Sequence, residues 1–231
     1  MTRQTRALRG LIFDLDGTLI DSNEIHAKAW QLAFVQFGKN LPIGEIREHM
    51  GKGGDLLVPD LLNGREMQRF GKELTDYRRD LFRKDFIDQI RPFPGIHSCF
   101  TRLRDLGIKL VLASSSDKKE VKHFIDLLGI KDLIEAATSK EDAEFSKPSP
   151  EIFEAAVKEI SLPLINLMTV GDTPYDILAS HRASLPIAAV LSGGFDRHIL
   201  QKAEFLFADV EELTRRVEEL ESWLASDRDK P

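Results

Sequence analysis

Short apolar runs alternate with amphipathic stretches along most of the chain. Runs with the length of buried strands lie at residues 11–13, 108–113, 133–136, 167–170, 187–190 and 205–207. Apolar positions at helical spacing lie between and after them, at residues 96–106, 118–128, 150–160, 175–183 and 210–224. Because strands and helices alternate, the pattern predicts an α/β fold with a Rossmann-like parallel sheet that helices cover on both faces.

One segment interrupts this alternation. A helix is predicted over residues 23–37, and the stretch from Pro42 to Arg91 is then charged and helical, with no convincing strand. The turn Pro92-Phe93-Pro94-Gly95 ends this stretch. We therefore predict a core domain made of residues 1–22 and 92–231, with an α-helical cap domain inserted over residues 23–91.

Composition narrows the classes of partner. The chain has 231 residues and a formal net charge of −6, and its small basic clusters alternate with acids, so we expect no nucleic-acid partner. No apolar run approaches the roughly 20 residues of a membrane span, so we expect no membrane association. The single cysteine, Cys99, excludes an intrachain disulfide and fits a reducing compartment. We expect a cytoplasmic protein.

Polar residues follow the predicted strands, where ligands bind in parallel sheets. They are Asp14 and Asp16 after the first strand, Ser114 and Ser115 after the second, Lys147 in a later loop, and Asp172 with Asp176 after the strand at 167–170. Each alone has an ordinary explanation as a turn, a helix cap or a solvated loop residue. If the loops converge, four carboxylates face one lysine, and such a cluster needs a cation. Mg²⁺ is the usual choice beside phosphate.

These residues carry a family resemblance that covers nearly the whole chain. The segment from Phe13 to Ser22, Phe-Asp-Leu-Asp-Gly-Thr-Leu-Ile-Asp-Ser, resembles the first motif of the haloacid dehalogenase (HAD) superfamily. Ser114 resembles the second motif of this superfamily, and Lys147 resembles the third. Gly171-Asp172, together with Asp176, resembles the fourth. The position of the insert resembles the helical cap of the phosphoglycolate phosphatase and β-phosphoglucomutase group.

The resemblance implies a Mg²⁺-dependent phosphatase that acts on a small phosphorylated metabolite, of phosphoglycolate or sugar phosphate type. Asp14 would be the nucleophile that forms an aspartyl-phosphate, and Asp16 would be the general acid and base. The metal ligands would be Asp14, Asp172, the backbone carbonyl of Asp16, and Asp176 directly or through water. Ser114, Ser115 and Lys147 would bind the transferring phosphoryl group.

Two further residues are candidates for substrate contact. Lys52 lies in Met50-Gly51-Lys52-Gly53-Gly54-Asp55, whose glycines would let the backbone approach a substrate; a flexible turn with a solvated lysine explains the segment equally well. His26 resembles a histidine that positions the acid/base aspartate in β-phosphoglucomutase. A structural histidine near the cap hinge is the alternative.

Other functions stay open at this point. The positions of the mutase's cap lysine and phosphate-binding arginine fall on Gly51 and Asp55, and Asp55 would repel the second phosphate that a mutase must hold. Lys52 could partly substitute, so a phosphosugar mutase is the alternative activity. A non-catalytic binding module on a HAD scaffold would be expected to lack the nucleophile or the lysine, and both are present. The apolar stripe at 210–224 fits packing on the sheet or a dimer interface, so we expect a monomer or weak dimer.

Overall fold

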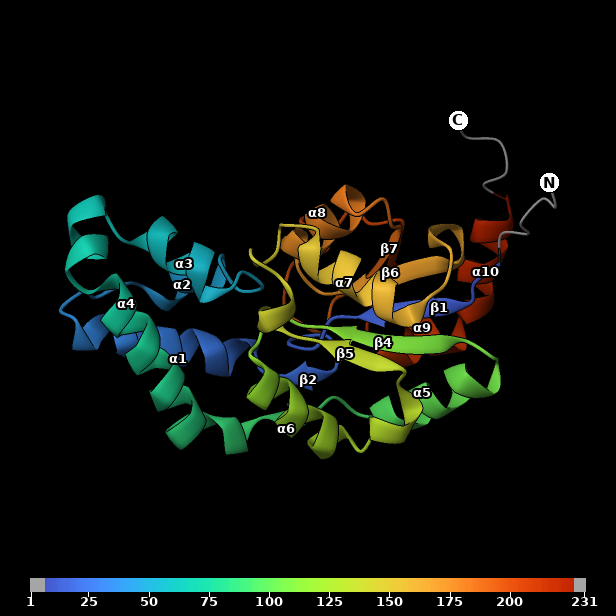
Figure 1. Cartoon of the computed structure of the whole chain (residues 1–231), viewed down its shortest axis with the longest axis horizontal. Helices are drawn as coiled ribbons and strands as arrows, with labels where there is room; N and C mark the ends of the chain where they lie inside the picture. The colour runs from blue at the N-terminus through green and yellow to red at the C-terminus, as the bar shows by residue number, and fades with distance from the viewer. Residues whose placement is uncertain (1–6, 227–231) are drawn as a thin grey trace.

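The computed structural model of the protein describes residues 7–226. Figure 1 shows a central sheet with helices on both faces and a group of helices at one end. Within the described residues the sheet has six strands in the order β5-β4-β1-β6-β7-β8, and all paired neighbours are parallel. The strands are β1 Gly10–Phe13, β4 Lys109–Ala113, β5 Ala136–Thr138, β6 Leu167–Gly171, β7 Ile187–Val190 and β8 Phe205–Phe207. The predicted Rossmann-like parallel sheet is confirmed.

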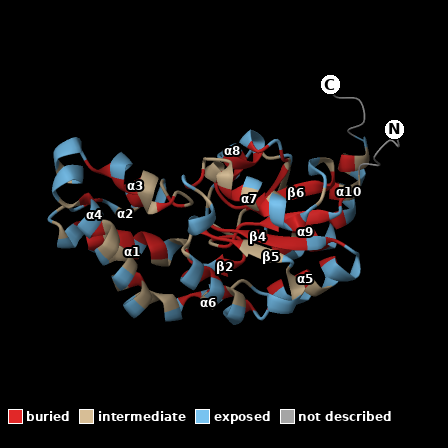
Figure 2. Ribbon diagram, viewed as in Figure 1, coloured by how far each residue is buried: buried red, intermediate tan, exposed pale blue. Residues whose placement is uncertain are grey.

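The strands bury both faces because successive side chains point to opposite sides of the sheet. In β1, Leu11 and Phe13 pack in one apolar cluster, whereas Ile12 packs in another. The first cluster includes side chains of α5 Ile96–Asp105, α6 Lys118–Leu128, α9 Val210–Arg215 and α10 Val217–Ser226. The second includes α7 Glu151–Ile160 and α8 Pro174–Arg182. Figure 2 shows these buried layers between the exposed outer faces of the helices.

The helices of the insert have an apolar cluster of their own. They are α1 Asn23–Gln36, α2 Ile43–Arg47, α3 Gly54–Leu61 and α4 Gly64–Leu81. Trp30, Phe34 and Leu57 are among the buried side chains that this cluster contains. A π-helical turn at Phe82–Phe86 and a 3₁₀ turn at Ile87–Gln89 lead back to the core. The domain boundaries stay a prediction, and the separate cluster is consistent with them.

A two-stranded ribbon lies where the chain passes between core and insert. β2 Ile20–Asp21 pairs antiparallel with β3 Arg91–Pro92. No strand was predicted here, because two residues cannot display a strand period. The ribbon holds the two crossing segments side by side at the base of the insert.

Two predicted elements differ from the structure. The strand expected at 133–136 is a 3₁₀ turn at Lys131–Leu133, and β5 begins later, at Ala136. The helix expected at 210–224 is divided at Arg216 into α9 and α10. Residues 1–6 and 227–231, assigned to the core domain from the sequence, lie outside the described residues. Within 7–226, no helix has both the length and the apolar character needed to cross a membrane.

Candidate active site

The predicted strand-end residues meet at the carboxyl edge of the sheet. Asp14 and Asp16 follow β1, Ser114 and Ser115 follow β4, Lys147 precedes α7, and Asp172 and Asp176 follow β6. Lys147 links the loops: its Nζ pairs with Asp14 Oδ1, lies 2.9 Å from Asp176 Oδ1, and donates to the Ala113 carbonyl at 3.0 Å. Three strand ends are therefore joined through one ammonium group.

Lys147 is 1% exposed, which is unusual for a lysine. Burial alone would lower its pKa, but the carboxylates of Asp14 and Asp176 outweigh burial and hold the pKa above its ordinary value. The side chain therefore stays an ammonium at neutral pH. Its position against Asp14 places a fixed positive charge beside the proposed nucleophile.

Three buried carboxylates form the candidate metal centre. Asp14, Asp172 and Asp176 each offer one oxygen, and these oxygens lie within 4.8 Å of one another. Burial raises the pKa of Asp14 to about 7, although the positive charge of Lys147 alone would lower it. Burial and the neighbouring carboxylates Asp176 and Asp14 raise that of Asp172. Clustered carboxylate oxygens fit a hard divalent cation, which would offset both the burial of their charges and their mutual repulsion.

Neighbouring side chains fix the orientation of these ligands. Asp172 accepts from Thr18 Oγ1 at 3.0 Å and from Asn23 Nδ2 at 2.9 Å. Asp176 Oδ2 accepts from the Thr173 amide at 3.0 Å and its hydroxyl at 2.6 Å, in the capping box that starts α8. Asp176 is thus oriented by the N-terminus of its own helix, whereas Asp172 depends on residues that follow β1.

The three serines of the loop after β4 differ in the hydrogen-bond partners of their hydroxyls. Ser114 is fully buried and its Oγ accepts from the Ser116 amide at 3.0 Å. Ser115 lines the cavity beside Asp14, and its buried Oγ has no hydrogen-bond partner among the described residues. Ser116 Oγ donates to Asp16 Oδ2 at 2.9 Å. Ser115 therefore offers a ligand a hydroxyl that is unpartnered within residues 7–226, phosphoryl binding by Ser114 stays a prediction, and Ser116, which was not a candidate from the sequence, supports Asp16.

The carboxylate of Asp16 lies outside the metal cluster. It accepts from Ser22 Oγ at 2.7 Å and contacts His26 Nε2 at 2.8 Å. Burial alone would raise the pKa of Asp16, but His26 and the two serine hydroxyls outweigh burial and hold it below the ordinary value. Asp16 is therefore ionised in this arrangement. Its predicted metal contact, through the backbone carbonyl, stays a prediction.

His26 connects Asp16 to the insert. Its imidazole stacks on Phe82, with ring centroids 4.3 Å apart, and its Nδ1 accepts from an Arg78 guanidinium nitrogen. Because Nδ1 accepts, the neutral ring carries its proton on Nε2 and donates it to Asp16. Burial and the positive charge of Arg78 lower the pKa of His26 and favour this neutral form. The contact is the one that a positioning role for His26 requires.

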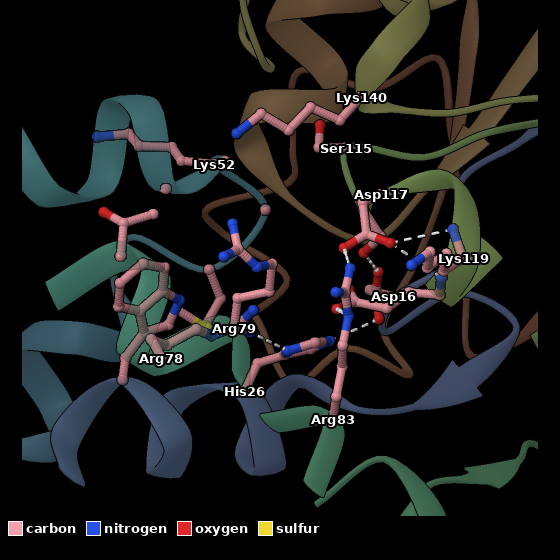
Figure 3. Close-up of a pocket in the computed structure, with 18 of the residues that line it drawn as sticks. Asp16, His26, Lys52, Arg78, Arg79, Arg83, Ser115, Asp117, Lys119 and Lys140 are labelled. Atoms are coloured by element: carbon pink, nitrogen blue, oxygen red, sulfur yellow. Dashed lines mark hydrogen bonds and ion pairs between the residues drawn. The ribbon is translucent and has the colours of Figure 1, made fainter. Parts of the chain in front are cut away.

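A cavity of about 680 Å³ lies above Asp14 and Asp16, between the insert and the core. The loop from Met50 to Gly54 forms part of its wall. Lys52 lines it too, but its Nζ donates to Asp60 at 2.5 Å and extends away from Asp16 (Figure 3). The volume is in the range of small-molecule sites. Substrate contact by Lys52 stays a prediction.

The same loop docks closely on the core. Asp55 accepts from the hydroxyl of Ser146 at 2.6 Å and from its amide at 3.1 Å. A Cβ on Gly53 would lie 2.0 Å from Ser146 Oγ, and one on Gly51, at φ +96°, would lie 2.7 Å from Thr173. The glycines therefore permit contact with core loops. Asp55 is engaged by Ser146 beside the cavity, and its repulsion of a second phosphate stays a prediction.

Comparison with known proteins places this site in a family. Residues 11–190 match the haloacid dehalogenase-like hydrolases. A phosphoglycolate phosphatase of Yersinia pestis is 29% identical over 197 residues, covering 81% of this chain and 83% of the relative. A pyrophosphatase of Oceanobacillus iheyensis, PpaX, is 24% identical over 209 residues, covering 90% of this chain and 95% of the relative.

The fold of both core and insert occurs in a solved structure. A candidate β-phosphoglucomutase from Bacteroides vulgatus superposes with a TM-score of 0.82 at 22% identity, covering 96% of this chain and 92% of that one. At this level of identity the likeness concerns the fold alone.

Proposed function

Because this chain belongs to the haloacid dehalogenase-like hydrolase family, we propose that it is a Mg²⁺-dependent phosphatase acting through an aspartyl-phosphate on Asp14. The match and its phosphatase relatives support the class of phosphoric monoester hydrolases. The observation that carries the proposal is the buried Lys147 between Asp14 and Asp176, because Asp14 itself lines the cavity. The site thus combines a nucleophile, a fixed cation and a divalent-metal cluster.

In the first half-reaction, an Asp14 oxygen bonds to phosphorus as the bond from phosphorus to the ester oxygen breaks. Lys147 and the hydroxyls of Ser114 and Ser115 contact the phosphoryl oxygens, and the ammonium of Lys147 balances their charge. Asp14, Asp172 and Asp176 would hold Mg²⁺, which supplies positive charge to the transferring group when bound. The products of this step are the aspartyl-phosphate and the alcohol.

Asp16 moves the protons. It protonates the leaving oxygen, and in the second half-reaction it removes a proton from the water that attacks phosphorus, so that inorganic phosphate leaves and Asp14 is regenerated. Asp16 is ionised in the free protein, which suits the base role directly. For the acid role it must gain a proton, and the negative charge of a bound phosphate raises the pKa of a nearby carboxyl group.

The substrate class is a small phosphomonoester, of phosphoglycolate or sugar phosphate type. We also propose a reducing, cytoplasmic setting, because the single cysteine, Cys99, cannot form an intrachain disulfide. The test is turnover of p-nitrophenyl phosphate, then of phosphoglycolate, hexose phosphates and pyrophosphate, each with Mg²⁺ and with EDTA. Full activity in a rigorously metal-free sample would refute the metal site, and no turnover of any ester would refute the phosphatase.

The mutase remains the second activity to test, because the B. vulgatus neighbour has the same fold. The two positions that would grip a distal phosphate are occupied by Gly51 and by Asp55, which is engaged with Ser146. We therefore propose water as the main acceptor. The assay follows β-glucose 1-phosphate with a trace of glucose 1,6-bisphosphate. Glucose 6-phosphate forming much faster than inorganic phosphate would instead identify a mutase, and silence with every ester would favour a binding module.

A further inference from the structure

Cationic and acidic side chains line the cavity in equal number, and the six acids are Asp14, Asp16, Asp80, Asp117, Glu120 and Glu141. Six cationic side chains line it: Lys52, Arg78, Arg79, Arg83, Lys119 and Lys140. Three of them are engaged with carboxylates, namely Lys52 with Asp60 (2.5 Å), Arg79 with Asp76 (2.9 Å), and Arg83 with Asp117 and Glu120. Within residues 7–226, the side chains of Arg78, Lys119 and Lys140 form no ion pair with a carboxylate. These three side chains are called the unpaired cations below.

Arg78 is the most rigidly held of the unpaired cations. Its guanidinium lies between two aromatic faces, 4.9 Å from the Trp30 ring centre and 4.7 Å from that of Phe82. One of its nitrogens donates to His26 Nδ1, and its buried Nε has no partner among the described residues. Stacking fixes the plane of the guanidinium and leaves donors in that plane unused, an arrangement suited to binding a planar or tetrahedral anion.

The position of Arg78 limits the length of its ligand. His26 contacts Asp16 through Nε2 at 2.8 Å and Arg78 through Nδ1, so a single imidazole ring separates the guanidinium from the acid/base carboxylate. Figure 3 shows this chain of contacts from Asp16 through His26 along the cavity. In the proposed mechanism the leaving oxygen of the ester lies at Asp16. An anion bound by Arg78 would therefore lie only a few bonds from the ester oxygen.

The other two unpaired cations come from the core side of the cavity. Lys119 is in the first turn of α6, and Lys140 extends from beside Ser115 toward the insert (Figure 3). Arg78 and these lysines belong to distant parts of the chain, and they line one cavity. Because carboxylates line the same cavity, an anion would be held by direct contact with the donors of Arg78 and not by the net charge of the wall.

We propose that Arg78 is a specificity-determining residue that selects phosphomonoesters with a second anionic group, carboxylate or phosphate, a few bonds from the ester oxygen. Lys119 and Lys140 are further donors on the core side of the same cavity. This inference rests on the proposed phosphatase function and deepens it, because it names the feature that distinguishes preferred esters from others. It also locates a distal-anion site on α4, away from the Gly51 and Asp55 positions.

The test uses three two-carbon esters that differ at one end: 2-hydroxyethyl phosphate, 2-phosphoglycolate and ethane-1,2-diol bisphosphate. In the wild-type enzyme with Mg²⁺, kcat/KM for the better of the two anionic esters should exceed that for the neutral ester about ten- to a hundredfold, as expected for a charged hydrogen-bonded contact. The two anionic esters tell carboxylate from phosphate. A wild-type ratio near one for both overturns the inference.

Arg78→Gln separates specificity from positioning. If Arg78 only orients His26, the variant slows all three esters equally and the ratio is unchanged, which also overturns the inference. If Arg78 binds the second anion, the ratio collapses toward one, mainly through KM, and Arg78→Lys restores part of it. Arg79→Gln is the matched control, because Arg79 is adjacent and already paired with Asp76; its ratio should stay at the wild-type value.

The outcomes also distinguish this inference from the proposed function. Hydrolysis of all three esters at similar rates, by wild-type enzyme and Arg78→Gln alike, refutes only the specificity assignment. No hydrolysis of any ester or of p-nitrophenyl phosphate refutes the phosphatase, and the specificity assignment with it.

Discussion

Replacing Asp172 by asparagine should stabilise the metal-free protein while removing its response to Mg²⁺. Asp172 is fully buried, and its oxygen lies within 4.8 Å of those of Asp14 and Asp176. Two ionised oxygens 4.8 Å apart repel by about 3.5 kcal/mol at an effective dielectric constant of about 20. Asparagine keeps the size of the side chain and can still bond to Thr18 and Asn23, so the variant loses the charge and little else.

The sign of the effect follows from the pKa of Asp172. Burial, with Asp176 and Asp14, raises this pKa above 3.8, so the folded metal-free protein holds the proton more tightly than the unfolded chain does. Stability therefore falls as pH rises from 3.8 through the raised value of the folded state. Asparagine does not ionise, so the advantage of Asp172→Asn should widen as pH rises.

Thermal unfolding measures both effects. With Mg²⁺ at a hundred times its dissociation constant, the wild-type protein should gain about 2.7 kcal/mol, or roughly 5–10 °C in Tm for a chain of this size. Asp172→Asn should gain little. In EDTA the variant should be the more stable protein, and Mg²⁺ should narrow the difference by roughly the 2.7 kcal/mol that only the wild type gains. Equal Mg²⁺ shifts in both proteins would refute the assignment of Asp172 as a metal ligand, and a less stable variant in EDTA would refute the repulsion.

Three further predictions concern single side chains. Asp14→Asn should abolish turnover, because an amide does not displace the ester oxygen; near wild-type turnover of p-nitrophenyl phosphate, with circular dichroism confirming the fold, would contradict the covalent step. Asp16→Asn should slow phosphoglycolate hydrolysis severely. It should still form the aspartyl-phosphate with p-nitrophenyl phosphate, because that leaving group needs no acid, and rapid-quench phosphate labelling tests this. Unchanged steady-state rates would contradict the prediction. Burial raises the pKa of Glu120 from 4.5 to about 7, although Arg78 and Arg83 alone would lower it. Ionisation of Glu120 therefore lowers the free energy of unfolding by about 3 kcal/mol as pH rises across that interval. Glu120→Gln should flatten the plot of Tm against pH between pH 5 and 7.5. A plot parallel to that of the wild type would contradict this prediction, because another group would then be responsible for the slope.

The strand-end residues could be predicted because their chemistry is local. Asp14, Asp172 and the serines each follow an apolar run, and the carboxyl ends of parallel strands meet at one edge. Burial adds what the sequence does not state: Lys147 is enclosed, and Asp16 points toward His26 and away from the metal cluster.

Residues of the insert were not predictable in the same way. Arg78 lies 52 positions from His26, in a helix whose charged residues read as a solvated face. Only the packing of α4 on α1 brings it to the cavity. The ribbon of β2 and β3 was missed because two-residue strands show no periodicity.

The contact between Asp55 and Ser146 has a consequence for the end of the catalytic cycle. Ser146 immediately precedes Lys147, so the insert is hydrogen-bonded to the loop that carries the Lys147 ammonium. In the proposed reaction, movement of the insert away from the core at this contact would break two hydrogen bonds, worth about 1.5 kcal/mol each, before phosphate could leave there. Such a cost is within reach of domain motions on the microsecond-to-millisecond scale. Product release and the freedom of the Lys147 loop are thereby tied to one event.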